Sequence, residues 1–382
     1  MNRVRAAVLT RSGGPIPYAE SRPIEIREME LGAPGPGELE IEIRAAGLCH
    51  SDLSVIDGSR PRPLPMVLGH EASGEVAAVG PGVTRFSPGD RVVLAFVPSC
   101  GECGPCLDGR AALCEPGAAA NAVGELIGGG TRWSHASGEQ HSHHLGVSAF
   151  AERVVVSENS AVAIPDELDF ATAAVFGCAA LTGVGAALNA ASVEPGESVA
   201  VFGLGGVGMC ALLGAKLSGA GQVIAVDPVE SKRQLALELG ADLVFDGGPS
   251  TVEEIRSATA GGGAAKAIET AGSAKVLEAA YAATARGGTT VTVGLPDPSQ
   301  MLSIPAVSLT AEERVLRGSY LGSANPAEML PRLFDFWREG RLPLERLVSH
   351  RLDLDSINEG FDRLREGEAV RQVIEFASGR SG

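Results

Sequence analysis

Four cysteines lie close together in the first third of the chain, in the pattern Cys-x2-Cys-x2-Cys-x7-Cys. They are Cys100, Cys103, Cys106 and Cys114. Four thiolates suit a tetrahedral zinc ion, and four protein ligands leave that ion no open position. We therefore predict a structural zinc site that fixes a loop and carries out no chemistry itself.

Three further residues of metal-binding types are scattered along the chain: Cys49 in GLCHSD, His70 in GHE and Cys178 in FGCAALTG. Two thiolates and one imidazole can hold zinc while leaving a fourth position open, as catalytic zinc sites do. This pattern is the weaker of the two, because a buried cysteine is more often an inert part of a core. We interpret Cys210, which stands alone in a predicted helix, in that way.

Beyond residue 180, short apolar runs alternate with segments of helical periodicity. Strands are predicted at 198–203, 222–227, 265–272 and 288–296, and helices at 207–219 and 231–241. Such alternation indicates βαβ units that build a parallel sheet. The predicted fold class is therefore α/β.

The sequence Gly203-Leu-Gly205-Gly-Val-Gly208 joins the first of these strands to the first helix. Its glycines permit a tight turn, the approach of a pyrophosphate to the backbone, and close packing of helix on strand. Asp227 ends the next strand, where a carboxylate can bind the adenosine ribose and would repel a 2′-phosphate. We predict NAD rather than NADP, with Lys232 as a second ribose contact. The alternative is a plain glycine-rich turn beside a solvent-facing aspartate.

The first half of the chain is predicted to be rich in β-strands. Apolar runs at 38–47, 72–80 and 90–97 are separated by turns that contain Pro and Gly. Residues 117–146 show no periodicity, so we expect a long excursion whose histidines face solvent, apart from His144. The run RQVIEF at 371–376 is strand-like and could return to the first domain.

Composition disfavours two classes of partner. A net charge of −16 repels phosphate backbones and anionic lipid, so we expect neither nucleic acid nor a membrane as a partner. The uncharged stretch 170–193 is long enough to span a bilayer, but its polar and small residues favour a buried helical region. Seven cysteines without an apolar N-terminal leader indicate a reducing, cytoplasmic location.

Together these motifs resemble those of the zinc-dependent medium-chain alcohol dehydrogenases. The resemblance covers essentially the whole chain and rests on GLCHSDL, GHEASGEVAAVGPGV, the four cysteines, the Cys178 segment, GLGGVG with Asp227, and GEAVRQV. It implies a GroES-like, β-rich catalytic domain at 1–179 and 322–382, and a Rossmann domain with a doubly wound parallel sheet at 180–321. It also implies two zinc ions per chain and, by analogy, a homodimer joined near residues 301–320.

The resemblance implies a role for each matching residue. Cys49, His70 and Cys178 would bind the catalytic zinc, and the four-cysteine cluster would bind the structural zinc. Asp52 would orient His70 and Glu71 would be a nearby acid, with simple surface charge as the alternative for both. The cofactor would be contacted by His50, Thr182 and Arg371. The substrate pocket would be lined by Phe96, His144, Leu145, Leu295 and Tyr320.

The implied reaction is hydride transfer between NAD and an alcohol whose oxygen is polarised by zinc, with Ser51 accepting the hydroxyl proton. The family often has a histidine three residues further on, but this chain has Ser54. We therefore expect water or His50 to carry the proton to solvent. The partly apolar pocket favours a primary alcohol or aldehyde with a carbon chain or ring.

Three alternatives are weighed against this interpretation. A thiol-adduct-dependent formaldehyde dehydrogenase of the same family stays open, although Arg60 and Ala118 make the anchoring of a thiol conjugate incomplete. A zinc-free reductase of the same superfamily is disfavoured by Cys49, His70 and the four-cysteine cluster. A non-catalytic binding protein is disfavoured by Ser51 and the open ligand set. A third metal at the HSHH segment (141–144) is not expected.

Overall fold

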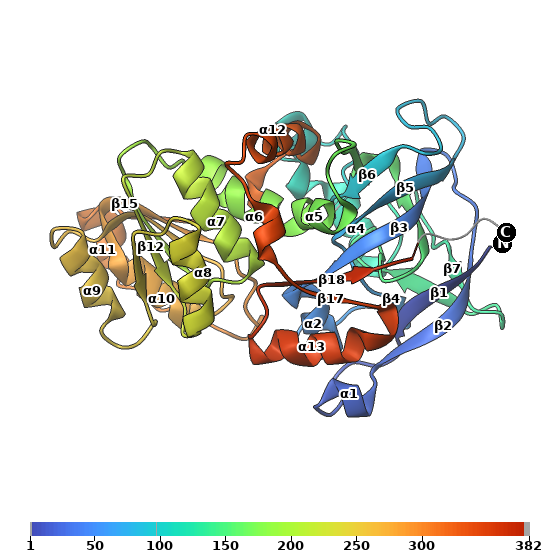
Figure 1. The fold of residues 1–382 in the computed structure, drawn as a ribbon, viewed down its shortest axis with the longest axis horizontal. Helices are drawn as coiled ribbons and strands as arrows, with labels where there is room; N and C mark the ends of the chain where they lie inside the picture. Colours follow the sequence, from blue (N-terminus) through green and yellow to red (C-terminus); the bar gives the residue numbers. More distant parts are fainter. Residues whose placement is uncertain (1, 97, 378–382) are drawn as a thin grey trace. The chain divides into compact units, whose positions relative to one another are not determined.

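The computed structural model describes residues 2–96 and 98–377 (Figure 1). Residues 1 and 378–382 of the predicted catalytic domain, and residue 97 of the predicted strand 90–97, lie outside the described residues. The chain forms two compact units. The first unit is Met1–Cys178, Asn325–Phe334 and Leu344–Gly382, and the second unit is Ala179–Ala324 and Asp335–Pro343.

The first unit is built on a closed barrel and a seven-stranded sheet. The barrel has the order β1-β2-β7-β8-β4; the sheet has the order β10-β6-β5-β3-β18-β17, with β9 also paired to β3. The strands are β1 (Asn2–Leu9), β2 (Ile24–Leu31), β3 (Glu38–Leu48), β4 (Met66–Val67), β5 (Ala72–Val79), β6 (Arg91–Leu94), β7 (Trp133–Ser134), β8 (Gln140–His143), β9 (Arg153–Ser157), β10 (Ala161–Ala163), β17 (Val348–Leu352) and β18 (Arg371–Glu375).

Strand β18 returns to the first unit from the end of the chain, as the strand-like run RQVIEF predicts. It pairs antiparallel with β3, so that Gln372 lies opposite Leu48. This pairing places Arg371 beside the residues that follow β3, which include Cys49. The helical elements of this unit are α1 (Tyr18–Ser21), α2 (His50–Ile56), α3 (Gly104–Leu107), η1 (Ala111–Leu113), α4 (Glu115–Val123), η2 (Glu158–Ser160), α5 (Phe170–Val175), η6 (Leu344–Leu347), η7 (Leu354–Ser356) and α13 (Ile357–Glu366); α12 (Pro326–Arg338) begins in this unit.

The predicted excursion over residues 117–146 contains regular elements. The segment contains most of α4 and the strands β7 and β8, which pair with each other and close the barrel. Helix α4 begins where the Cys114 sulfur accepts a hydrogen bond from the Gly117 N–H, and it ends at Gly124 with a positive φ of 75°. These elements are too short for hydrophobic periodicity to reveal them.

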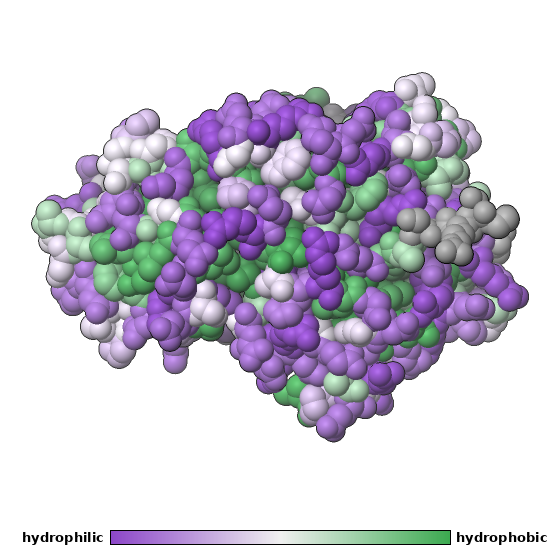
Figure 2. All heavy atoms as spheres, in the orientation of Figure 1, coloured by the Kyte–Doolittle hydropathy of each residue, from purple (hydrophilic) through white to green (hydrophobic). Residues whose placement is uncertain are grey.

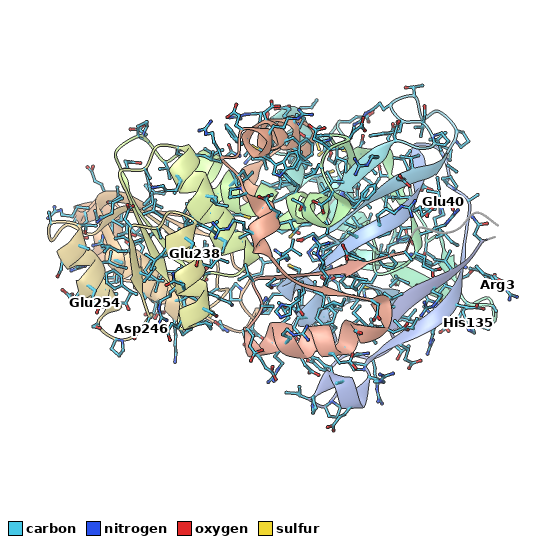
Figure 3. The ribbon with its side chains drawn as sticks, in the orientation of Figure 1. Arg3, Glu40, His135, Glu238, Asp246 and Glu254 are labelled. Carbon is cyan, nitrogen blue, oxygen red and sulfur yellow. The ribbon has the colours of Figure 1, made fainter. Side chains whose placement is uncertain are left out.

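Two histidines of this segment, His141 and His143, do not face solvent, contrary to the prediction. His141 and His143 are buried because alternate residues of β8 point to the same face, and that face is covered. His144, one residue beyond the strand, is also buried, and for it no exposure to solvent was predicted. His135 is partly exposed and lies at the periphery of the first unit (Figure 3).

The second unit contains a six-stranded parallel sheet in the order β13-β12-β11-β14-β15-β16. The strands are β11 (Ser198–Phe202), β12 (Gln222–Val226), β13 (Leu243–Phe245), β14 (Ala264–Glu269), β15 (Thr284–Thr292) and β16 (Val315–Gly318). The predicted strands 265–272 and 288–296 extend too far, since β14 ends at Glu269 and β15 at Thr292. The residues beyond those ends form loops at the carboxyl edge of the sheet.

Helices connect these strands, as the alternating pattern predicts. They are α7 (Gly206–Leu217), α8 (Glu230–Glu238), α9 (Thr251–Ala258), α10 (Ala274–Ala283) and α11 (Ala306–Ala311), followed by η5 (Leu321–Ser323). A buried cluster that includes Phe202, Ile224, Ile255 and Ala280 packs α9 and α10 against the sheet. Cys210 is fully buried in α7, which agrees with its interpretation as a core residue.

One helical stretch, Phe170–Ala190, is long and apolar enough to cross a membrane by length and composition alone. It comprises α5 (Phe170–Val175), η3 (Phe176–Ala180), α6 (Leu181–Gly185) and η4 (Ala186–Ala190), and η3 and η4 are π-helical turns. Of the most apolar 18 residues of this stretch, 94% are buried inside the protein. A core helix therefore accounts for the uncharged stretch.

On the face drawn in Figure 2, hydrophilic residues, in purple, lie over elements of both units.

Candidate active site

The four clustered cysteines converge on one point in the first unit. Their sulfur atoms lie within 4.8 Å of one another. The sulfurs of Cys103 and Cys106 are 3.5 Å apart, close to the edge of about 3.8 Å that a tetrahedron with Zn–S bonds of about 2.3 Å requires. The N–H groups of Glu102 and Cys103 donate to the Cys100 sulfur at 3.4 and 3.3 Å, and they lower the pKa of that thiol to about 7. The donor set and its spacing therefore fit zinc.

The second group of metal-binding residues also comes together. The ligand atoms of Cys49, His70 and Cys178 lie within 4.8 Å of one another. The His70 Nε2 atom is 3.6 Å from the Cys178 sulfur, which matches the separation of about 3.6 Å between nitrogen and sulfur ligands on a tetrahedral zinc. A hydrogen bond from Cys178 and the charge of His70 hold the pKa of Cys49 well below its ordinary value, against the effect of burial. This set also fits zinc, and three ligands leave a fourth position open.

A buried carboxylate orients the imidazole of His70. The Asp52 Oδ2 atom lies 3.0 Å from His70 Nδ1, and both side chains are fully buried. The backbone N–H of Gly69 donates to Asp52 Oδ1 at 3.0 Å. Gly69 has a φ of +95°, and a Cβ atom there would lie 2.6 Å from the backbone nitrogen of Phe150. Because Asp52 holds Nδ1, the Nε2 atom faces the two sulfurs.

Glu71 forms a second buried acidic contact next to the cluster. Its Oε2 atom lies 3.3 Å from the guanidinium of Arg371, which also donates to the Leu48 carbonyl at 3.1 Å. Burial raises the pKa of Glu71 to about 7, although Arg371 acts in the opposite direction. A Cβ atom at Gly47 would lie 2.3 Å from Glu71 Oε1, so the carboxylate occupies space that any other residue at position 47 would fill.

Helix α2 carries the residues predicted to move the proton. It begins directly after Cys49, so His50 and Ser51 lie in its first turn, with His50 exposed and Ser51 partly exposed. The Ser54 hydroxyl donates to the His50 carbonyl at 2.8 Å. The Ser54 hydroxyl proton is therefore engaged in a hydrogen bond with the helix backbone. In this arrangement Ser54 does not take the place of the histidine that the family often has at this position.

Three predicted pocket residues lie near His70 or in the loop after β8. The ring of Phe96 meets His70 edge-on at 5.2 Å, and the ring of His144 lies 5.6 Å from His70. His144 is only 2% exposed, and burial lowers its pKa to about 4. Leu145 follows with a left-handed φ of +52°, and its N–H donates to the Asn121 side chain at 3.1 Å. Backbone strain of this kind is common at binding sites.

In the second unit, the three glycines occupy the positions that a dinucleotide loop requires. Gly203 turns with a φ of +91° after β11. A Cβ atom at Gly208 would lie 1.7 Å from the Gly203 carbonyl oxygen, so α7 packs directly on the turn. A Cβ atom at Gly205 would meet nothing within 4 Å, which leaves open space over the start of α7. The N-terminus of this helix is thus accessible to an anion.

Asp227 lies beside this loop. Its two carboxylate oxygens accept hydrogen bonds from the N–H groups of Leu204 at 2.7 Å and Val229 at 2.9 Å. Each oxygen keeps a second lone pair that a ribose hydroxyl can use. Lys232 is buried nearby, and burial lowers its pKa while the charge of Asp227 raises it.

Three other predicted site residues belong to the same unit. Thr182 is buried in α6, Leu295 follows β15 and Tyr320 follows β16.

Comparison with known proteins identifies this combination of sites. The family model for the alcohol dehydrogenase GroES-like domain matches residues 35–166, and that for zinc-binding dehydrogenases matches residues 206–337. Putative alcohol dehydrogenase D of Mycobacterium tuberculosis is 39% identical over 97% of this chain and 99% of its own length. The chain belongs to the zinc-dependent medium-chain alcohol dehydrogenase family.

Other members of this alcohol dehydrogenase family are equally similar. The NDMA-dependent alcohol dehydrogenase of Amycolatopsis methanolica is 38% identical, covering 97% of this chain and 98% of the relative. Geraniol dehydrogenase of Castellaniella defragrans is 40% identical, covering 97% of each chain. These matches support a zinc-binding oxidoreductase that acts on alcohols.

Solved alcohol dehydrogenase structures share the fold over the full length. An alcohol dehydrogenase zinc-binding domain protein from Burkholderia ambifaria has a TM-score of 0.92 at 35% identity, covering 99% of this chain and 100% of that chain. Benzyl alcohol dehydrogenase from Acinetobacter calcoaceticus has a TM-score of 0.89 at 31% identity, with the same coverage. The GroES-like and Rossmann folds are therefore confirmed, and the boundaries at 179/180 and 321/322 stay predictions.

Sequence reasoning missed three residues that shape these sites in this alcohol dehydrogenase. Gly47 gives Glu71 its space, Gly69 carries the turn that anchors Asp52, and Glu269 organises the end of β14. The glycines that begin GLCH and GHE were a signal of close backbone approach. Glu269 had no comparable signal, because its hydrogen bond to Thr292, which lies in another strand, could not be foreseen from the sequence around it.

Proposed function

We propose that this protein is an NAD-dependent dehydrogenase of primary alcohols and aldehydes that binds two zinc ions. The observation that carries the proposal is the convergence of Cys49, His70 and Cys178 next to the buried Asp52. A donor set of two thiolates and one imidazole, with an oriented imidazole and an open fourth position, is the form that catalytic zinc takes in dehydrogenases.

A zinc ion held there would act as a Lewis acid toward an alcohol oxygen. The protein's own residues then have separable roles in the proposal. Asp52 keeps Nε2 of His70 directed at the metal position. Glu71, the residue after His70, forms a buried ion pair with Arg371. Ser51 accepts the hydroxyl proton, and His50, exposed in the same helix turn, passes it toward water.

NAD would supply the hydride acceptor, and Asp227 supports the choice of NAD. Its carboxylate is held in place by two backbone N–H groups, so it cannot swing away to admit a 2′-phosphate. The Gly203 turn and the open space above Gly205 support a pyrophosphate at the start of α7. Arg371 is also proposed to contact the pyrophosphate.

The predicted pocket residues favour substrates with a carbon chain or ring. Phe96 and Leu145 are apolar and buried, and they lie in the same unit as His144. Relatives named for geraniol and for benzyl alcohol indicate the same chemical class. We therefore propose a primary allylic, benzylic or medium-chain alcohol as the substrate.

A substrate and acceptor panel tests the proposal. Purified, zinc-loaded protein would be assayed with benzyl alcohol, geraniol, octanol and ethanol, each with NAD, NADP or NDMA as the acceptor. NADH formation from the larger alcohols is expected, with NADP at least tenfold less efficient. Turnover only with NDMA would overturn free NAD as the acceptor, and formaldehyde oxidation only with an added thiol would favour the thiol-adduct alternative. A Ser51→Ala variant should lose most of its turnover and keep its zinc.

A further inference from the structure

Glu269 is a buried carboxylate at the end of β14 for which the proposed reaction has no use. It is 1% exposed. Its Oε1 atom accepts from the N–H groups of Gly272 at 2.6 Å and Ser273 at 3.5 Å, and its Oε2 atom accepts from the Thr292 hydroxyl at 2.8 Å. A buried carboxylate is costly unless hydrogen bonds compensate for lost water. This one uses those bonds to join two loops.

The backbone reinforces the same junction. The Val293 N–H donates to the Glu269 carbonyl at 2.8 Å. A Cβ atom at Gly294 would lie 2.1 Å from the Gly272 nitrogen, so the two loops pack backbone against backbone. The segments 270–273 and 293–295 therefore form one surface with Glu269 beneath it.

A third strand end joins this surface. The Ser319 N–H donates to the Thr292 carbonyl at 2.9 Å, which ties the segment after β16 to the end of β15. The predicted pocket residues Leu295 and Tyr320 follow directly from these two strands. Loops that hold Leu295 and Tyr320 are thus linked to Glu269 through Thr292.

The strand order places this surface in one half of the dinucleotide site. Ligands of open parallel sheets bind at the carboxyl ends of the strands, where the strand order reverses. Here the reversal falls between β11 and β14. Asp227 follows β12 on one side of it, and that half would take the adenosine. The ends of β14, β15 and β16 lie on the other side, which is left for the nicotinamide nucleotide.

We infer that Glu269 is a positioning residue for the nicotinamide half of the dinucleotide, acting through the backbone of residues 270–273 and 293–295. The inference rests on the proposed NAD dependence. Burial raises the pKa of Glu269, while its hydrogen bonds from Thr292 and Gly272 lower it. Those donors set the geometry of the loops whether or not a ligand is bound, so the nicotinamide would meet a surface that is already ordered.

Comparing the binding of NADH with that of ADP-ribose separates this positioning role from a general structural role. The dissociation constants of NADH and of ADP-ribose, which lacks the nicotinamide, would be measured by calorimetry for the unmodified protein and for Glu269→Leu. We expect NADH binding to weaken on the order of tenfold in Glu269→Leu, since hydrogen bonds to a charged group are lost. ADP-ribose binding should change less than about twofold, because Asp227 and the Gly203 turn hold that half.

Two milder variants and a control complete the experiment. Glu269→Gln keeps an oxygen acceptor for Gly272 and should restore NADH binding to within about threefold. Thr292→Val removes one donor and should weaken NADH binding severalfold with ADP-ribose binding unchanged, and it serves if Glu269→Leu fails to fold. Glu253→Leu removes an exposed carboxylate from α9 of the same unit. This control variant should bind NADH and ADP-ribose as tightly as the unmodified protein.

The outcomes distinguish the inference from the proposed function. Equal weakening of NADH and ADP-ribose binding, or no weakening of NADH binding, would overturn the positioning role while leaving NAD dependence in place. Failure of the unmodified protein to bind NADH would overturn the NAD proposal and the inference together.

Discussion

At the scale of single residues, the reactive atoms of the first unit are held by side chains that are themselves buried and paired. Asp52 lies between the Gly69 N–H and the imidazole of His70, so His70 has one orientation available. Partners of this kind raise metal affinity without touching the metal. The residue types could be predicted from GLCHSD and GHE, but the contact itself depends on how β3 and β4 end.

Loss of the Asp52 carboxylate should loosen one zinc and spare the other. In Asp52→Asn, we expect the affinity of the Cys49–His70–Cys178 site for zinc to fall by about 10- to 100-fold. Metal content after graded dialysis against a chelator, measured by mass spectrometry, would show one zinc lost early. The matched variant Asp57→Asn changes an exposed carboxylate at the end of the same helix. Equal zinc retention by the two variants would contradict the orienting role.

His143 is expected to make the folding stability depend on pH. Burial, with the nearby charge of Arg132, lowers its pKa to about 3, against about 6.5 in the unfolded chain. The unfolded state therefore binds the proton first, so the stabilisation is full above about pH 6.5 and is lost as pH falls toward 3. This residue alone should cost about 2 kcal/mol between pH 7 and pH 5.

Denaturant unfolding at several pH values tests this assignment. His143→Asn should lower the stability overall but flatten its decline between pH 7 and pH 5. His135→Asn, at the periphery of the same unit, should leave the decline unchanged. A slope that is the same in all three proteins would mean that His143 does not govern acid stability.

At the scale of elements, the turn from β11 into α7 combines a folding requirement with a binding requirement. Gly208 is needed because α7 packs on the Gly203 carbonyl, whereas Gly205 faces open space. The GxGxxG spacing predicted both glycines, yet only the structure separates their roles. Other elements escaped prediction, among them α4 and the β7–β8 pair, because short segments carry too few residues to show a period.

Alanine at these two glycines should therefore affect different properties. Gly208→Ala should lower the free energy of unfolding by about 3 kcal/mol, since its Cβ atom would overlap the Gly203 carbonyl. Gly205→Ala should leave stability nearly unchanged and weaken NADH binding, because its Cβ atom enters the space proposed for the pyrophosphate. Thermal unfolding and NADH titration of both variants provide the measurements. A stable Gly208→Ala protein would show that the helix can shift away.

At the scale of the whole molecule, strand β16 offers a surface for association. It is the last strand of its sheet, and its exposed Val315 belongs to the segment predicted for dimerisation, which also carries the exposed Val307 and the 83% exposed Met301. An unpaired strand edge with apolar neighbours favours pairing with another chain. Pairing of two β16 edges about a two-fold axis would extend the sheet across a dimer.

Charge at this edge should separate the subunits. Light scattering on the unmodified protein is expected to give the mass of two chains, and Met301→Asp combined with Val315→Arg is expected to give the mass of one. Val123→Arg changes an exposed apolar residue of the first unit and should leave the dimer intact. A monomeric unmodified protein would contradict the proposed dimer, and a dimeric double variant would place the interface elsewhere.

The sequence alone determined the family, the fold class, the ligand types and the dinucleotide loop, since each depends on residues close together in the chain or on a repeating pattern. The tertiary structure decided what no local pattern contains. It brought Cys178 to His70, buried the histidines of residues 141–144, and placed Glu269 between its own strand's following loop and the end of β15. These outcomes arise from packing between distant segments, where burial and hydrogen bonding are settled only once the chain has folded.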